Sequence, residues 1–253
     1  MRDGKAIAWL AAICLILTGC ARSPAPNADS LTVAAAANLT GLMDEIAREF
    51  EKETNVRVVV SYGSTAQLAQ QIEHGGPFDV FAAADSEHVD ALVEKGKLRR
   101  ESRAIYARGQ LALWRPDKSA RVERIEDLTN PAIRFIAVAQ PELAPYGKAT
   151  VEALKAVGIW EQVQPKIVYA NNISMTKQYA SSGNADVAFT ALSLVLKERG
   201  TVLKVDPKLY RPIDQALAIT TATERVLTAK RFVGFVLGER GRALLSNSGY
   251  LLP

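Results

Sequence analysis

The sequence contains few of the residues that usually carry catalysis or hold metal ions. Its 253 residues include two His and two Cys, too few for a His/Cys metal cluster or a disulfide framework. Lys and Arg exceed Asp and Glu by 31 − 27 = 4, and no run of five or six like charges concentrates this surplus. The charge therefore does not indicate nucleic-acid binding. With 48% hydrophobic and 23% charged residues, the composition is globular and excludes a disordered tail or a multi-span membrane protein.

Motifs typical of common enzyme chemistries are missing as well. The sequence has no G-x-S-x-G, no H-E-x-x-H and no G-x-x-x-x-G-K-[ST]. His74 and His88, its two imidazoles, lie in polar, charge-flanked contexts that are typical of surface residues. Because no nucleophile is paired with a base, the sequence argues against an enzyme.

The first twenty residues have the pattern of an export signal followed by a lipidation site. A basic start precedes an unbroken apolar run at residues 6–17, which is too short to span a bilayer and is typical of a signal-peptide core. The tetrapeptide Leu-Thr-Gly-Cys that ends at Cys20 resembles the lipobox of bacterial lipoproteins. The resemblance implies that residues 1–19 are removed and that Cys20 is lipidated, with residues 20–30 as a lipid-anchored tether. An ordinary secretory signal and an uncleaved anchor are the alternatives.

Beyond residue 30 the chain alternates predicted strands with predicted helices. The first alternation predicts strands at 31–36, 56–61 and 79–83, and helices that begin near residues 38, 65 and 86. The second predicts strands at 133–139, 167–170, 186–190 and 202–205, helices at 148–157, 174–181 and 192–199, then a strand at 212–220 and helices at 223–237 and 238–245. This order favours parallel sheets with crossover helices.

Two long extended segments, at 105–114 and 212–220, join the two alternations. The sequence therefore predicts an α/β protein of two lobes with a ligand cleft between them. We expect residues 31–110 plus 212–253 to form lobe 1 and residues 111–211 to form lobe 2. Each lobe is expected to hold a mostly parallel sheet flanked by helices.

Neutral hydrogen-bonding residues follow the predicted strands, where ligands bind in open α/β sheets. Asn38 follows the first strand, Ser64 and Thr65 follow the second, and Tyr146 and Ile173 follow strands of the second alternation. Each helix start leaves about four N–H donors unsatisfied and carries roughly half a unit of positive charge. Four such ends in one cleft predict an oxyanion site without Lys or Arg. Taken singly, these residues are also typical of helix caps, a surface tyrosine and a core isoleucine.

Five segments occur in the order and spacing of one known family. They are 33–72 (beginning VAAAANLTGLMDEIAREF), GGPFDVFAAAD at 75–85, QPELAPYGKATVEAL at 140–154, YANNISMTKQYASSGNADVAFTALS at 169–193 and GYLLP at 249–253. Through them, residues 31–253 resemble the molybdate-binding proteins of ABC transporters. The most specific parts are APYG and ANN…GNADVAFTAL.

This resemblance implies a type II periplasmic-binding-protein fold that binds molybdate, and also tungstate, and delivers it to an ABC transporter permease. It implies that the oxyanion contacts are Asn38 in the first loop, Thr65 flanked by Ser64 in the second, the Tyr146 hydroxyl and the Ile173 backbone N–H. The metal is then bound only as the oxyanion, and no cofactor is expected. We expect an exported monomer, held at the periplasmic or cell surface by the lipid on a cysteine, with no nucleic-acid partner.

The sequence departs from the family pattern at two points. Some members bind the ligand with a tyrosine at the position that Ala191 occupies here, so this chain resembles the branch that uses Tyr146. The second loop reads Gly-Ser-Thr-Ala, where a second Ser and a Gly are frequent. The backbone N–H of Thr65 is therefore a firmer expectation than its side chain.

The chemistry of the predicted ligand agrees with the donors in these loops. Molybdate is a fully ionised dianion at neutral pH and only accepts hydrogen bonds, so its site should supply only donors. Phosphate can keep a proton and usually also needs an acceptor, and Glu142 is the one carboxylate in these loops. Sulfate has the same charge as molybdate but is smaller, so the cavity must discriminate by size. A binding protein for another oxyanion, such as sulfate or phosphate, and a ligand-sensing module are the alternatives.

Overall fold

The computed structural model describes residues 30–116 and 122–253. The predicted signal peptide, Cys20 and positions 20–29 of the predicted tether lie outside the described residues. Within the described ranges, no helix is long and apolar enough to cross a membrane. The same ranges contain no group of three or more His, Cys, Asp or Glu that could hold a metal ion.

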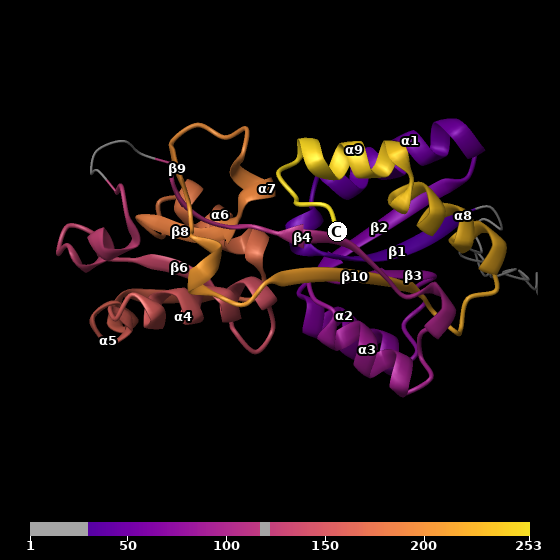
Figure 1. The fold of residues 1–253 in the computed structure, drawn as a ribbon, viewed down its shortest axis with the longest axis horizontal. Helices are drawn as coiled ribbons and strands as arrows, with labels where there is room; N and C mark the ends of the chain where they lie inside the picture. The colour runs from indigo at the N-terminus through magenta and orange to yellow at the C-terminus, as the bar shows by residue number, and fades with distance from the viewer. Residues whose placement is uncertain (1–29, 117–121) are drawn as a thin grey trace, which may run out of the picture.

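Two five-stranded sheets, each flanked by helices, form two lobes that lie side by side (Figure 1). The first lobe has the sheet order β2-β1-β3-β10-β4. Its strands are β1 (Ser30–Ala36), β2 (Arg57–Gly63), β3 (Val80–Ala82), β4 (Ala104–Gly109) and β10 (Ile213–Ile219). Its helices are α1 (Leu42–Thr54), α2 (Thr65–Glu73), α3 (Glu87–Glu94), α8 (Val226–Leu237) and α9 (Glu239–Asn247), with the short 3₁₀ helices η1 (Ala37–Leu39) and η2 (Arg100–Ser102).

The second lobe has the sheet order β7-β6-β8-β5-β9. Its strands are β5 (Leu111–Arg115), β6 (Ile136–Ala139), β7 (Ile167–Ala170), β8 (Val187–Ala191) and β9 (Thr201–Lys204). Its helices are α4 (Pro145–Ala156), α5 (Trp160–Val163), α6 (Ile173–Ser181) and α7 (Leu192–Val195), with η3 (Ile125–Thr129), η4 (Gln164–Lys166) and η5 (Pro207–Leu209).

The predicted two-lobed α/β fold is confirmed, but both sheets are more mixed than expected. In the described residues of lobe 1, β1 pairs in parallel with β2 and β3, whereas β10 runs antiparallel to β3 and β4. In lobe 2, β6 pairs in parallel with β7 and β8, whereas β5 runs antiparallel to β8 and β9. Both β5 and β10 begin where the chain has just crossed from the other lobe. They therefore start at the cleft, where the parallel strands end.

The chain passes between the lobes at two places. The segment predicted as extended at 105–114 is two strands, β4 and β5, which are separated by Gln110 and belong to different sheets. The second passage leads from η5 into β10 (Figure 1). Because both passages lie beside the strand ends, they hold those ends of the two sheets close to each other.

Some helices differ from their predicted bounds. The helix expected to open at Asn38 is the short η1, and α1 begins only at Leu42, because Gly41 has a φ of 82° that interrupts the helix. The helix predicted at 192–199 is limited to the four residues of α7, and α5 was not predicted. Asn38 therefore lies within η1 and does not cap α1.

Buried apolar residues fix the position of the strand ends. Every residue of β6 and β8 is buried, which explains their continuous apolar sequence. The helix α1 buries Ile46 and Phe50 at a spacing of four residues. The ring of Phe50 meets that of Phe232 on α8 edge-on, with centroids 5.2 Å apart. The strand ends are thus carried by rigid, packed elements.

Candidate functional site

The ends of parallel strands from both lobes meet at one small cavity. It is lined by Ala36, Ala37, Asn38, Gly63, Ser64, Thr65, Ala84, Ala144, Pro145, Tyr146, Asn172 and Ile173. These residues end or follow β1, β2, β3, β6 and β7. All five residues that the sequence predicted as a binding site are in this lining. The cavity is small, with a volume of about 10 Å³, which is about the space that one water molecule needs.

The lining of this cavity contains no charged side chain. Of its polar members, Asn38, Ser64, Thr65 and Tyr146 are each at most 2% exposed, whereas Asn172 is half-buried. Glu142, the carboxylate that could have served as an acceptor, is exposed and is not part of the lining. An anion bound here would be held by neutral dipoles in a place that excludes water, where hydrogen bonds are strong.

Two helix N-termini bring backbone donors to the cavity. Thr65 is the first residue of α2 and Ile173 is the first residue of α6, and the N–H of a first helical residue has no acceptor within its helix. The caps that precede them, Ser64 and Asn172, accept from N–H groups further into the same helices, at 3.4 Å and 3.0 Å. The caps therefore leave the N–H groups of Thr65 and Ile173 without an acceptor inside their helices.

The Thr65 hydroxyl also remains able to donate. Its Oγ1 accepts from the backbone N–H of Ala84 at 3.1 Å, which uses a lone pair and not the hydroxyl proton. The structure thus leaves both the backbone N–H and the hydroxyl of Thr65 available as donors.

Tyr146 presents its hydroxyl from lobe 2, where it is the second residue of α4. Its Oη accepts from Gln215 Nε2 at 3.0 Å. Burial raises the pKa of the Tyr146 hydroxyl well above its ordinary value, with a further contribution from Tyr250, so the group keeps its proton at neutral pH. The start of α4 lies so close to the end of β6 that a Cβ on Gly147 would overlap the Ala139 carbonyl.

Asn38 lines the cavity, but its amide is already engaged within the protein. Its Nδ2 donates to Gln215 Oε1 at 2.9 Å and to the Tyr250 hydroxyl at 2.8 Å. Its Oδ1 is buried and has no hydrogen-bond partner among the described residues. The sequence suggested the amide N–H as a ligand donor, whereas the structure directs that N–H toward two protein acceptors.

Three residues around the cavity were missed by the sequence analysis. Gln215, Tyr106 and Tyr250 form a buried network behind Asn38 and Tyr146. One signal was available, because a Gln in the apolar strand PIDQALAIT has to find buried hydrogen-bond partners. Nothing in the sequence indicated which partners these are, since Asn38, Tyr106 and Tyr146 come from three separate elements.

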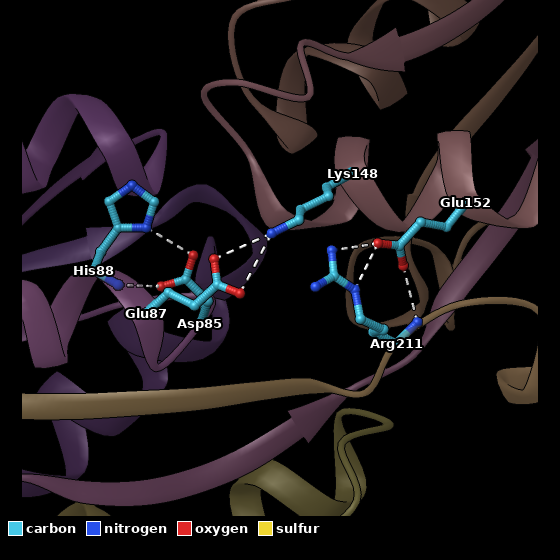
Figure 2. Close-up of polar contacts among 6 residues, drawn as sticks. All are labelled: Asp85, Glu87, His88, Lys148, Glu152 and Arg211. Atoms are coloured by element: carbon cyan, nitrogen blue, oxygen red, sulfur yellow. Dashed lines mark hydrogen bonds and ion pairs between the residues drawn. The ribbon is translucent and has the colours of Figure 1, made fainter.

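A larger cavity of about 290 Å³ lies beside the small one and shares Pro145 with it. Figure 2 shows Asp85, Glu87, Lys148, Glu152 and Arg211 from its lining. Lys148 of lobe 2 donates to Glu87 of lobe 1 at 3.1 Å, and Arg211 donates to Glu152 at 2.6 Å. Because these cations are already paired and Asp85 adds a further carboxylate, this cavity does not favour an anion despite its size.

The lobes contact each other directly around the small cavity. The backbone N–H of Ala66 in lobe 1 donates to the carbonyl of Leu143 in lobe 2 at 3.2 Å. Ser193 of lobe 2 donates to the Asn38 carbonyl of lobe 1 at 3.0 Å. Together with the Gln215–Tyr146 bond, these contacts describe a closed arrangement in which donors from both lobes surround one point.

Two α/β lobes that close over an uncharged, donor-lined cavity at their strand ends define a solute-binding protein. The chain belongs to the family of bacterial extracellular solute-binding proteins, whose sequence profile matches residues 31–251. The members of this family are extracellular proteins that bind solutes.

The comparisons with individual proteins agree with this assignment. The chain is 35% identical over 234 residues to the molybdate-binding protein ModA of Azotobacter vinelandii, covering 89% of this chain and 91% of that protein. It is 33% identical over 225 residues to the molybdate-binding protein ModA of Rhodobacter capsulatus, covering 88% and 89%. The solved structure of the periplasmic molybdate-binding protein of A. vinelandii superposes with a TM-score of 0.86 at 32% identity, covering 88% of this chain and 99% of that chain.

Proposed function

We propose that the protein binds molybdate between its lobes and delivers it to the permease of an ABC transporter. The observation that carries this proposal is the buried cavity between the lobes, which holds hydroxyl and helix N-terminal donors and no charged side chain. A fully ionised dianion needs only donors. The relatives from A. vinelandii and R. capsulatus, which are named for molybdate binding, support the same ligand.

Each lobe contributes part of the proposed binding site. Residues 31–110 plus 212–253 form the lobe that supplies Ser64 and Thr65, and residues 111–211 form the lobe that supplies Tyr146 and the Ile173 N–H. The side chain of Asn38 is proposed to support the residues that donate to the ligand, since its own N–H groups bond to Gln215 and Tyr250. Closure of the lobes completes the site and excludes water.

Tungstate has the same shape and charge as molybdate, and we propose that it binds as well. Phosphate that keeps a proton needs an acceptor for it, and the lining of the cavity offers no carboxylate. Sulfate needs only donors, so we propose that its smaller size weakens its contacts with donors fixed for a larger ion.

The N-terminal sequence supports a lipid anchor at Cys20, with the folded lobes tethered to a membrane surface in the periplasm or at the cell surface. Replacement of Cys20 by Ser is expected to release the protein into the soluble fraction after cell breakage. Retention of the Cys20→Ser variant in washed membranes would contradict the anchor. We also propose that the protein acts as a monomer, which sedimentation with and without ligand would test.

Calorimetric titration of the purified protein with molybdate, tungstate, sulfate and phosphate tests the proposed ligand. Molybdate and tungstate should bind far more tightly than the other two anions. In a thermal-shift assay, a ligand that binds only the folded state raises stability by RT ln(1 + [L]/Kd), so the same order should appear in the melting temperatures. Equal affinity for sulfate and molybdate would reject the proposed specificity.

A further inference from the structure

Ser193 is a side chain of lobe 2 that contacts lobe 1 from outside the lining of the small cavity. It is the second residue of α7, and its Oγ lies 3.0 Å from the Asn38 carbonyl oxygen and 3.1 Å from the Tyr250 hydroxyl oxygen. The Tyr250 oxygen itself lies 2.8 Å from the same carbonyl. Three oxygen atoms from the two lobes thus meet at hydrogen-bond distances, whichever of the two hydroxyls donates to the carbonyl.

Both sides of this contact are held firmly by their own surroundings. In lobe 2, the residue before Ser193 is Leu192, which is buried and whose N–H donates to the Gln110 carbonyl at 2.9 Å. In lobe 1, Tyr250 is 4% exposed, and the next residue, Leu251, exchanges two backbone hydrogen bonds with β4. Because packed elements of this kind do not yield easily, the three oxygen atoms set a lower limit to the distance between the lobes at this place.

A second direct contact between the lobes lies on the opposite side of the sheets. It is the bond from the Ala66 N–H of lobe 1 to the Leu143 carbonyl of lobe 2, at 3.2 Å. Ala66 belongs to α2 and Leu143 precedes α4, and these two helices lie below the sheets in the view of Figure 1, whereas α7 and α9 lie above them. Together with the two passages of the chain between the lobes, the two contacts support one lobe against the other at three places.

These supports also set the distance between the proposed ligand donors of the two lobes. Ala66 directly follows Thr65, a proposed donor of lobe 1, and Leu143 lies three residues before Tyr146, a proposed donor of lobe 2. Any change in the separation of the lobes would therefore move the donors of lobe 1 relative to those of lobe 2. An anion smaller than the gap between the two sets of donors would not reach both sets at once.

We propose that Ser193 is a positioning residue that determines which size of oxyanion the cavity accepts. By holding the lobes at a fixed separation, it keeps their donors at the spacing of a larger tetrahedral anion such as molybdate and too far apart for sulfate. The inference rests on the proposed oxyanion-binding function and explains how its size preference arises. Ser193 lends itself to a test by substitution, whereas the Ala66–Leu143 bond joins backbone atoms.

Ser193→Ala removes the hydroxyl and leaves the backbone and Cβ in place. The space of one oxygen atom then separates α7 from the Asn38 carbonyl, so that the lobes can tilt about the remaining supports and follow a smaller anion. Calorimetric titration of the purified protein gives the dissociation constant for molybdate, and competition against molybdate gives that for sulfate. The ratio of the two constants is the readout, because a general loss of stability would change both constants alike.

We expect Ser193→Ala to lower the preference for molybdate over sulfate by about 3- to 10-fold. Ser181→Ala is the matched control, since Ser181 lines the same surface groove as Ser193 but donates to the Gln178 carbonyl of its own helix at 3.0 Å. The control should alter the ratio by less than about twofold. An unchanged ratio in Ser193→Ala would overturn the inference. Equal losses of affinity for both anions would overturn it as well, because the contact would then only hold the lobes together.

A crystal structure of Ser193→Ala with sulfate bound provides a second, direct measurement. In it α7 should lie closer to the Asn38 carbonyl than in the wild-type protein with molybdate bound, and the same spacing in both structures would overturn the inference. A wild-type protein that binds no oxyanion, or that binds sulfate as tightly as molybdate, would refute the proposed function itself. A strong wild-type preference for molybdate that Ser193→Ala leaves unchanged would refute only the role of Ser193.

Discussion

Gly109 is the residue at which the position of the Tyr146 hydroxyl can be tested by adding a single carbon atom. A Cβ at Gly109 would overlap Tyr146 Oη and would lie 2.6 Å from Gln215 Nε2 and 2.8 Å from Tyr146 Cζ. The backbone of Gly109 does not have a positive φ, so alanine adds no conformational strain of its own. The steric effect is therefore confined to the place where Gln215 meets Tyr146.

The magnitude follows from the size of the overlap. Contacts shorter than 3.0 Å force the Tyr146 ring or the Gln215 amide to shift, which disturbs the 3.0 Å bond between them. Overpacking of this kind costs about 1–3 kcal/mol. Because Gly109 lies in β4 of lobe 1 and Tyr146 in α4 of lobe 2, this cost falls on the closed form that holds the ligand. We therefore expect Gly109→Ala to weaken molybdate binding about 5- to 150-fold.

Titration calorimetry with molybdate, together with the molybdate-induced rise in melting temperature, measures this loss. Gly234→Ala is the matched control: Gly234 is exposed within α8, and a Cβ there meets nothing within 4 Å. It should leave the affinity unchanged and stabilise the helix by about 0.5–1 kcal/mol. Wild-type affinity in Gly109→Ala would show that the Tyr146 hydroxyl does not need its observed position, and the reasoning on the site would fail.

Three further predictions concern single contacts around the site. Tyr146→Phe should weaken molybdate binding by roughly 1–3 kcal/mol in calorimetry, because it removes a hydrogen bond to a charged ligand, and unchanged affinity would remove Tyr146 from the site. Glu87→Gln breaks the ion pair with Lys148 across the lobes, and since both groups are exposed the affinity should change by less than about fivefold and become less sensitive to salt. The hydrogen bond to Asp85 raises the pKa of His88, so this pair stabilises the fold at low pH and loses its effect as the pH rises through the raised pKa. The difference in melting temperature between wild type and His88→Gln should accordingly be larger in acid than in alkali, and a constant difference would contradict this linkage.

The sequence predicted the residues that line the cavity more completely than it predicted their surroundings, for a physical reason. The end of a parallel strand followed by a helix is a local feature, so Ser64, Thr65 and Ile173 could be recognised from neighbouring residues alone. The hydrogen-bond partners of a buried polar side chain are not local. Gln215 is separated from Asn38 by 177 positions and from Tyr146 by 69, and only the fold brings the three together.

The same limit explains why the sheets and Asn38 differ from expectation. The antiparallel placement of β5 and β10 depends on where the chain crosses between lobes, which hydrophobic patterns do not encode. The amide of Asn38 was expected to face a ligand because it follows a strand. Its two acceptors, Gln215 and Tyr250, come from the last forty residues of the chain. No sequence pattern near Asn38 predicts these contacts.

The absence of charge in the cavity has a consequence for release of the ligand. A site built on Lys or Arg would retain electrostatic attraction for a dianion after the lobes separate, whereas neutral donors attract it strongly only at close range and without water. Here the proposed donors are divided between lobes, with Thr65 on one and Ile173 and Tyr146 on the other. Opening would also break the Gln215–Tyr146 bond, which leaves the Tyr146 hydroxyl free to rotate. The holding strength of the site is thus a property of the closed form, and a partner that separates the lobes would release the anion without competing for it.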